Sequence, residues 1–393
     1  MKIAMFLDTA FPPDSRVENE AICLIKAGHE VHLFSLDYQG RPSNEVINEI
    51  TVHRYKVDKL TYKLSALAYT FPFFHNRIKP SIKDFINKLK PNVLHIHDMV
   101  IAKAVIDVNA GKLKVVLDLH ENRPEIMKHY KHVNEGLGKI LISTDKWNKV
   151  QDKLIKRSDK LILVTEEAKN DVMSKGLKKA EDIVVVPNTI LPELFLNYSI
   201  DESILDRFNS TFNILYLGDT SLRRGTDTAI KSMKIIKDKI PNARLILVGD
   251  SSVDNKLKQL ASNEGVNNLV SFEGWQDVSL FPSYTLASNI CISPLKRNKH
   301  HDTTFANKLF QYMAMGKPVV VSDSTTQANV VREEECGLIF PAENELLLAQ
   351  QIIQLYENDE LAYRLGENGK KAVQDRWNWD VTSEGLIEMY QTL

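Results

Sequence analysis

Residues 302–323 read DTTFANKLFQYMAMGKPVVVSD, and this stretch decides the fold. Leu309, Tyr312 and Met313 recur at helical spacing, and Thr303 or Thr304 precedes them as a candidate N-cap. A glycine and then a proline follow, as is typical where a helix ends. The three valines after them are too few for a helix and favour a strand covered on both faces. A helix leading into such a strand predicts a parallel α/β sheet.

The same stretch predicts an anion site. Lys308 lies in the first turns of the expected helix, where unpaired backbone N–H groups and the positive end of the helix dipole already favour negative charge. The lysine adds a full positive charge there. An ordinary connecting helix with a solvated lysine would produce the same pattern, so this stretch alone leaves both interpretations open.

Alternating strand and helix patterns extend through the whole chain. Residues 2–7 form an apolar strand pattern, residues 17–27 a helix pattern that ends at Gly28, and residues 29–36 a second strand pattern, which together predict a βαβ unit. The fold class predicted is therefore α/β, with two doubly wound, Rossmann-like domains. Further strands are expected at residues 92–97, 113–119, 160–165, 183–186, 212–217, 243–248, 269–273 and 289–293, and helices from about residue 227 and over residues 345–356.

A chain of 393 residues exceeds what one core usually supports, so two domains are expected. Periodicity is weak over residues 191–209 and a proline interrupts them, which indicates an interdomain linker. The predicted division is a first domain at 1–190, the linker at 191–209, a second domain at 210–376 and a C-terminal tail at 377–393.

Composition narrows the possible partners. Residues 1–190 carry a net charge of +6 and the remainder −7, so the first half is too weakly basic to predict nucleic-acid binding. The three cysteines lack metal-binding spacing and favour buried thiols in a reducing compartment. Neither a signal peptide nor an apolar run of about 18 residues is visible. A cytoplasmic protein without membrane spans is expected.

Residues 59–90 combine aromatic side chains with lysines and an arginine. An amphipathic element of this composition suits the headgroup level of an anionic membrane, which would make the protein peripheral at the inner face of the membrane. A pair of core-packing helices with a solvated basic face is the alternative interpretation.

Polar clusters follow two of the predicted strands, at the sheet edge where α/β proteins bind ligands. Metal binding is the alternative interpretation of such His, Asp and Glu groups, but the spacings match no common zinc pattern, so no metal site is expected. Arg16, in the loop after the first strand, is a further candidate for contacting phosphate or acceptor, although a surface arginine would fit the same position. The first cluster is His95, His97 and Asp98, and the second is Asp118, His120 and Glu121.

Several segments together resemble one enzyme family. NKLFQYMAMGKPVV, HIHD, LDLHENRPE and GDTSLRRG are similar to segments of the retaining glycosyltransferases of family 4, in the subgroup that makes bacterial polysaccharides. The resemblance covers nearly the whole chain. It implies the GT-B fold, in which two Rossmann-like domains face a cleft and a C-terminal tail helix crosses back to the first domain.

The resemblance also implies an activity. A hexosyl-type sugar would move from a nucleotide-diphosphate donor, linked to UDP or GDP, to a glycan or lipid-linked acceptor. The transfer would retain the anomeric configuration and would need no cofactor or metal.

In the family, two cationic side chains bind the donor diphosphate, and both belong to the loop that begins at Gly218 in this sequence. Asp219 stands at the position of the first cation, and Arg223 and Arg224 stand at the second. The guanidinium group of an arginine can donate two parallel hydrogen bonds to phosphate oxygens, so Arg224 can bind the diphosphate at the position of the second cation. With Lys308, these residues make up the expected diphosphate site.

The remaining assignments follow the same resemblance. The family frames its donor segment with two glutamates, and Thr303 and Gln311 stand at their positions. The amide of Gln311 can both accept and donate hydrogen bonds with the ribose hydroxyls. His120 is expected to face the transferred sugar. The expected catalytic residues are His120, Arg224 and Lys308; the donor-binding residues are Gly218, Arg223, Trp275, Asn307 and Gln311; the acceptor or phosphate side is Arg16, His97, Asp98 and Glu121.

Two other functions fit the same architecture. A sugar-nucleotide 2-epimerase shares the two-domain fold, and a non-catalytic nucleotide-sugar-binding homologue would explain why Thr303, Gln311 and Asp219 differ from the family pattern. Release of free nucleotide diphosphate distinguishes a transferase from both alternatives.

Overall fold

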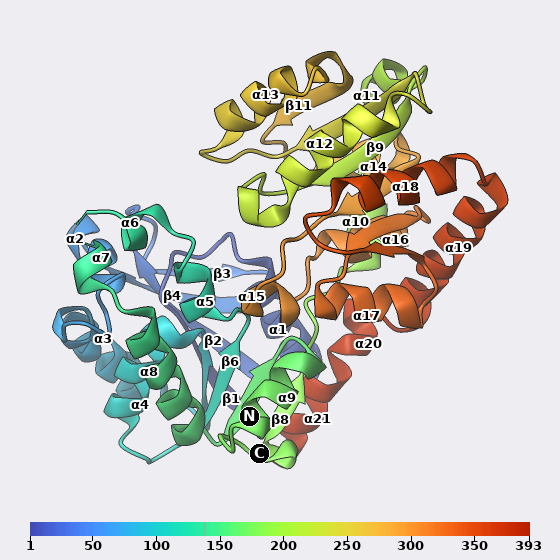
Figure 1. The fold of residues 1–393 in the computed structure, drawn as a ribbon. Helices are drawn as coiled ribbons and strands as arrows, with labels where there is room; N and C mark the ends of the chain where they lie inside the picture. The colour runs from blue at the N-terminus through green and yellow to red at the C-terminus, as the bar shows by residue number, and fades with distance from the viewer. Residues whose placement is uncertain (137) are drawn as a thin grey trace. The chain divides into compact units, whose positions relative to one another are not determined.

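The computed structural model describes residues 1–136 and 138–393. The chain divides into two compact units: Met1–Asn188 with Ser383–Leu393, and Thr189–Thr382. Each unit is an α/β sheet with helices on both faces (Figure 1). The fold class predicted from the sequence, two doubly wound domains, is confirmed.

The first sheet, within the described residues, has eight strands in the order β3-β4-β2-β1-β5-β6-β7-β8. All neighbours pair in parallel except β3 and β4. The chain runs outward from β1 and then returns to its other side, so the topological switch point lies between β1 and β5. The strands are β1 (Lys2–Leu7), β2 (Glu30–Asp37), β3 (Asn44–Ile47), β4 (Ile50–Lys56), β5 (Val93–His97), β6 (Lys114–Leu119), β7 (Lys160–Leu163) and β8 (Ile183–Val185).

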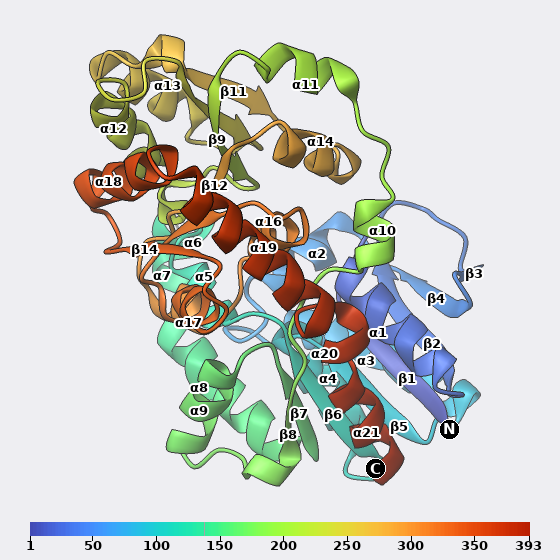
Figure 2. The same cartoon turned by 90° about the vertical axis from the view of Figure 1, so that its right-hand side faces the viewer.

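Helices cover both faces of this sheet (Figure 2). On one face the strands share a hydrophobic core with α3 (Phe73–Leu89), α4 (Met99–Asn109) and α8 (Thr144–Arg157). On the other face lie α1 (Ser15–Lys26) and, from the far end of the chain, α21 (Glu384–Thr392). The other helices of this unit are α2 (Lys59–Ser65), α5 (Arg123–Met127), α6 (Lys131–Asn134), α7 (Gly138–Leu141) and α9 (Glu166–Ser174).

The second sheet, in the described part of the chain, has six strands that all pair in parallel, in the order β11-β10-β9-β12-β13-β14. Its switch point lies between β9 and β12. The strands are β9 (Phe212–Leu217), β10 (Ala243–Val248), β11 (Val270–Gly274), β12 (Ile290–Ser293), β13 (Val319–Ser322) and β14 (Gly337–Phe340).

Two hydrophobic clusters flank the second sheet. One contains α12 (Thr226–Ile236), α13 (Asp254–Asn263) and α18 (Glu345–Tyr356); the other contains α14 (Phe281–Leu286), α16 (Lys308–Ala314) and α19 (Asp359–Asp375). Residues 191–209, expected as a linker, carry two short helices that belong to this unit. The remaining helices are α10 (Pro192–Leu196), α11 (Glu202–Phe208), α15 (Lys299–Asp302), α17 (Thr325–Glu333) and α20 (Trp379–Thr382).

The helix and strand expected around Lys308 are present, but the expected cap is wrong. Helix α16 begins at Lys308, with Asn307 in the N-cap position. Thr303 instead ends the short helix α15, and Thr304 donates its hydroxyl to the carbonyl of His300 at 2.7 Å. A helical turn before the threonines therefore uses the hydrogen bonds that capping would have needed.

The two histidines of this turn, His300 and His301, are buried. His301 is only 1% exposed, and its Nδ1 lies 2.7 Å from the carbonyl of Lys296. After α16, Gly316 has a φ of 67°, as the helix-ending position requires. Strand β13 then lies between two parallel neighbours, so its predicted burial on both faces is confirmed.

None of the helices in residues 1–136 and 138–393 has both the length and the apolar character needed to cross a bilayer.

Replacing Gly225 tests how tightly the second sheet's switch point is packed. Gly225 has a φ of 75°, and a Cβ added to it would lie 1.7 Å from the carbonyl oxygen of Pro294. Gly225→Ala should lower the free energy of unfolding by about 2–4 kcal/mol, measured by urea denaturation.

Gly265→Ala is the matched control. Gly265 has a similar φ of 67°, but an added Cβ meets nothing within 4 Å, so the dihedral strain alone should cost about 1–2 kcal/mol. Equal losses in both variants would mean that the close approach to Pro294 contributes nothing.

Candidate functional site

The loop after β9, residues 218–225, is held by its own polar contacts. The hydroxyl of Tyr216 donates to the carbonyl of Asp219 at 2.6 Å, and the Asp219 carboxylate accepts from the backbone N–H of Ser221 at 2.9 Å. A short 3₁₀ turn follows and carries Arg223 and Arg224. The loop therefore holds two arginines at the carboxyl end of β9, at the switch point of the second sheet.

Lys308 is the most unusual side chain at this edge. It is buried, and its Nζ lies 3.4 Å from the centroid of the Tyr216 ring. Within the described residues this Nζ has no hydrogen-bond acceptor. Burial, and then repulsion from Arg224, hold the pKa of Lys308 well below its usual value, although Asp219 opposes the shift. A buried ammonium without an acceptor is costly unless an anion binds there.

One carboxylate stands among these three cations. Asp219 Oδ2 lies 2.9 Å from a terminal nitrogen of Arg223 and 3.6 Å from Nε of Arg224. Burial alone would raise the pKa of Asp219, but its hydrogen bonds to Ser221 and the charge of Arg224 hold it below its usual value. With Lys308 protonated the group carries two positive charges in excess, which suits a phosphate-bearing ligand.

The other donor-side residues lie around this group. Gly218 begins the loop, and its Cα faces Lys308: an added Cβ would lie 3.7 Å from the lysine Nζ. Gln311 is half-buried, one turn along α16 from Lys308, and Asn307 is exposed just before that helix. Trp275, in the loop after β11, is 70% exposed. The structure thus brings together the three cations and Gly218, with Gln311 close in the same helix.

In the first unit, a buried polar cluster forms on the face of the sheet that carries α1. His97 and Asp118 are paired in register across β5 and β6. Asp118 Oδ2 lies 3.0 Å from His97 Nδ1 and 2.7 Å from His120 Nε2, and the two histidine nitrogens are 3.4 Å apart. Glu20 Oε1 lies 3.8 Å from His120 Nε2. All four side chains are buried.

Two further residues extend this cluster. His95 Nε2 lies 3.3 Å from Glu20 Oε2, and His95 Nδ1 lies 2.7 Å from the hydroxyl of Tyr390. Glu20 and Tyr390 were not among the sequence candidates. The signal for Glu20 was available, because it is the acidic residue on the apolar face of α1, between Val17 and Leu24. Tyr390 lies almost 300 residues beyond His95, and nothing in its local sequence indicates the contact.

Contacts and burial within this cluster shift the pKa values of its titratable groups in different directions. Burial alone would raise the pKa of Asp118, but its contacts with the three histidines hold it well below the usual range. Burial and the neighbouring Asp118 raise the pKa of Glu20 well above its usual value. Burial opposes a positive charge on His120, yet Asp118 raises its pKa overall. Burial lowers the pKa of His95 to about 4.

The other predicted residues of this unit lie at the same sheet edge. Burial opposes the charge of Arg16, but the carboxylates of Asp98, Asp14 and Glu121 outweigh it and raise its pKa. Asp98 has a φ of 61°, and its backbone N–H donates to the carbonyl of Asp118 at 2.8 Å. Arg16 is thus a partly buried cation facing carboxylates rather than a solvated surface arginine.

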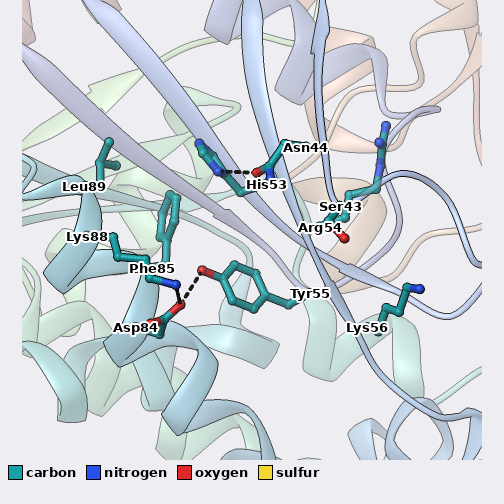
Figure 3. Close-up of a pocket in the computed structure, with 10 residues that line it drawn as sticks. All are labelled: Ser43, Asn44, His53, Arg54, Tyr55, Lys56, Asp84, Phe85, Lys88 and Leu89. Carbon is teal, nitrogen blue, oxygen red and sulfur yellow. Dashed lines mark hydrogen bonds and ion pairs between the residues drawn. The ribbon is translucent and has the colours of Figure 1, made fainter.

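A separate pocket of about 560 Å³ lies between β4 and α3 (Figure 3). Asp84 on α3 accepts from Tyr55 on β4 at 3.3 Å, and from Lys88, one turn further along α3, at 2.9 Å. None of the residues that line it is a predicted site residue. The pocket is therefore not the predicted site.

Two family models match this chain. The model described as Glycosyltransferase Family 4 matches residues 15–194, and the one described as Glycosyl transferases group 1 matches residues 201–372. Together they cover most of the chain, and each falls mainly within one of the two units.

Curated relatives carry related names. An uncharacterized glycosyltransferase of Methanocaldococcus jannaschii is 24% identical over 67% of this chain and 68% of its own length. The capsular polysaccharide biosynthesis glycosyltransferase CapM of Staphylococcus aureus is 25% identical over 59% of this chain and 61% of its length. N-acetyl-alpha-D-glucosaminyl L-malate synthase of Bacillus anthracis is 22% identical over 94% of this chain and 90% of its length.

Solved structures share the fold over the whole chain. Sucrose-phosphate synthase from Thermosynechococcus elongatus superposes with a TM-score of 0.77 at 18% identity, covering 100% of this chain and 98% of that one. Anabaena HepE in complex with UDP and glucose superposes with a TM-score of 0.73 at 15% identity, covering 100% of both chains. At these identities the likeness shows the fold.

Among the described residues the buried Nζ of Lys308 has no hydrogen-bond acceptor. The cost of this buried group can be tested by measuring the stability of a variant without it. Lys308→Met keeps the length and apolar contacts of the side chain but removes the buried charge, so the unliganded protein should become more stable by about 1–3 kcal/mol in urea denaturation. The lost contact with Tyr216 reduces this gain.

Lys317→Met is the matched control. Lys317 Nζ donates to the carbonyls of Leu286 at 3.0 Å and Ser288 at 2.6 Å, so its loss should destabilise the protein by about 1–2 kcal/mol. A loss of stability in both variants would show that Lys308 is satisfied in the unliganded protein.

Proposed function

Because this chain belongs to the glycosyltransferases, with a family 4 domain followed by a group 1 domain, we propose that it transfers a hexosyl-type sugar with retention of configuration. The donor is a nucleotide-diphosphate sugar, and the acceptor is a glycan or a lipid-linked acceptor. One observation carries the proposal: Lys308 is buried beside Arg223 and Arg224, and none of the described residues offers its Nζ a hydrogen-bond acceptor.

The chemistry of the step explains why cations matter. The leaving group is a nucleoside diphosphate on which negative charge develops as the sugar departs, and preorganised cations stabilise that charge most in a dry site. Arg224 can bind phosphate oxygens through its fork, and Lys308 adds a point charge from within the protein. These side chains neutralise the diphosphate, so the proposed step needs no metal there.

Retention does not require a protein nucleophile in this proposal. If the leaving group departs and the acceptor attacks on the same face of the sugar, the leaving phosphate oxygen can accept the acceptor's proton. Arg224 and Lys308 then act by holding that oxygen and its charge.

Donor selection is assigned to the residues around the cations. Gln311 is proposed to hold the ribose hydroxyls, with Gly218, Asn307 and Trp275 completing the nucleotide contacts. HepE was solved with UDP, and a relative from Mycobacterium tuberculosis is named as GDP-mannose-dependent. UDP and GDP are therefore the two nucleotides whose binding should be compared.

The sugar and acceptor side is assigned to the polar edge of the first unit. His120 is proposed to contact the transferred sugar, held by its 2.7 Å contact with Asp118. Arg16, His97, Asp98 and Glu121 are proposed to contact the acceptor or its phosphate.

A lipid-linked acceptor would bring the enzyme to a membrane. In the aromatic segment at residues 59–90 Tyr69 and Phe74 are buried, but Leu60 and Phe73 remain 53% and 55% exposed, in a segment that also carries lysines. We propose that this surface contacts anionic headgroups, which would place the protein in the cytoplasm at the inner face of the membrane.

Removing the cations tests the diphosphate assignment. Arg224→Ala and Lys308→Ala should each lower kcat/KM by at least about 10²-fold, the scale of losing one group that stabilises transition-state charge. Release of nucleotide diphosphate from UDP- and GDP-sugars is the measurement. Arg332→Ala, on the exposed side of α17, is the control and should stay near wild type.

Turnover within tenfold of wild type in both cation variants would refute the assignment. The same assay separates the other functions: an isomerised but intact donor indicates an epimerase, and nucleotide binding without any product indicates a non-catalytic homologue.

The ribose assignment is tested at Gln311. Gln311→Leu should weaken nucleotide diphosphate binding by about 1–3 kcal/mol, because the ribose hydroxyls lose a buried polar partner. Gln311→Glu should tighten it modestly, because a charged acceptor makes stronger hydrogen bonds. Calorimetry with the preferred nucleotide decides, and unchanged dissociation constants in both variants mean that the ribose is bound elsewhere.

A further inference from the structure

We propose that Glu20, His97, Asp118 and His120 bind one divalent transition-metal ion inside the first unit, and that zinc is the ion they fit. Each of the four side chains offers one nitrogen or oxygen ligand atom, and these atoms all lie within 4.8 Å of one another. All four residues are buried.

The distances between the ligand atoms lie on both sides of those in a tetrahedral site. Bonds of about 2.0–2.2 Å to nitrogen and oxygen put the ligand atoms of a tetrahedron about 3.3–3.6 Å apart. Asp118 Oδ2 lies 2.7 Å from His120 Nε2 and 3.0 Å from His97 Nδ1, the two nitrogens are 3.4 Å apart, and Glu20 Oε1 lies 3.8 Å from His120 Nε2. Small side-chain shifts would complete the coordination.

Three of the four ligands come from regular elements. His97 and Asp118 occupy paired positions in the register of β5 and β6, and His120 is the first residue after β6. Glu20 reaches the group from α1. A site held by two strands and a helix is preorganised, so binding costs little rearrangement.

The surroundings match those of a metal-bound carboxylate. His95 Nε2 lies 3.3 Å from the outer oxygen of Glu20, and the hydroxyl of Tyr390 lies 2.7 Å from the other nitrogen of His95. Partners of this kind orient ligands at metal centres. Among the described residues, Asp118 Oδ1 has no hydrogen-bond partner although it is buried. A divalent cation would neutralise the two buried carboxylates, which are costly when uncompensated.

The donor set selects the ion. Two imidazole nitrogens and two carboxylate oxygens in four positions suit Zn²⁺, whereas Mg²⁺ and Ca²⁺ prefer six or more oxygen ligands. Four protein ligands leave no open position, which is typical of a structural site.

His120 would use Nε2 for the metal and keep its other ring nitrogen for the proposed sugar contact. The metal is measured without nucleotide, so this proposal and the proposed function can fail separately.

The first experiment is on the whole protein. After expression with zinc and desalting, elemental analysis should find about one zinc per chain, and chelation should remove it. Adding one equivalent of Zn²⁺ to the chelated protein should raise Tm by at least about 3 °C. Co²⁺ in its place should give the intense visible absorption of a four-coordinate site. A chelated wild type that neither gains thermal stability with Zn²⁺ nor shows the cobalt bands overturns the proposal.

Matched variants locate the ion. Glu20→Gln and His97→Gln keep the side-chain size and should lower zinc affinity at least about tenfold, the scale for disturbing a metal site. The control is the double variant His32→Ala/His53→Ala, which removes a more accessible histidine pair whose ring nitrogens lie 3.0 Å apart. Zinc lost in the control but kept in the cluster variants contradicts the proposal. If a cluster variant fails to fold, the cobalt spectrum of the wild type still decides.

Discussion

Parallel pairing of strands is the constraint on which the rest of this structure depends. When neighbouring strands run the same way, all their carboxyl ends lie at one edge of the sheet, and the side chains that follow them meet there. In the first unit this brings Arg16, Asp98 and Glu121 to one edge, with His97 and His120 at the strand ends. In the second unit it brings the loop after β9 to the helix that begins at Lys308.

The charged side chains buried at the edges of the two sheets differ in their surroundings. In the second unit Lys308 is buried with the ring of Tyr216 beside it, and its Nζ has no acceptor in the part of the chain that the structure describes, so a bound anion would offset part of the cost of its charge. In the first unit the buried carboxylates of Asp118 and Glu20 lie among three histidines, and Asp118 Oδ2 contacts all three. One edge carries an excess of positive charge and suits an anion, whereas the other gathers buried carboxylates and imidazoles, a set of groups that suits a cation.

The C-terminal helix α21 links distant parts of the sequence. Ser383–Leu393 belong to the first compact unit although the preceding residues belong to the second. Through Tyr390 this last helix contacts His95, and so reaches the network that includes Glu20 and His120. Helix α21 is therefore part of the environment of the polar cluster. Deleting this helix would remove the contact between Tyr390 and His95.

The sequence by itself determined the fold class, most strand positions and the identity of the cations. Apolar runs such as 3–7 and the valines before Ser322 have a local physical cause, because a strand buried on both faces is mostly apolar. Tertiary structure alone decided how α16 begins, because the helical turn at His300 takes up the threonine hydroxyls expected to cap it. It also decided that Glu20, His97, Asp118 and Tyr390 meet, since those contacts depend on strand register and on two helices packing on one face. Local periodicity encodes burial, whereas contacts between distant residues appear only when the sheet is assembled.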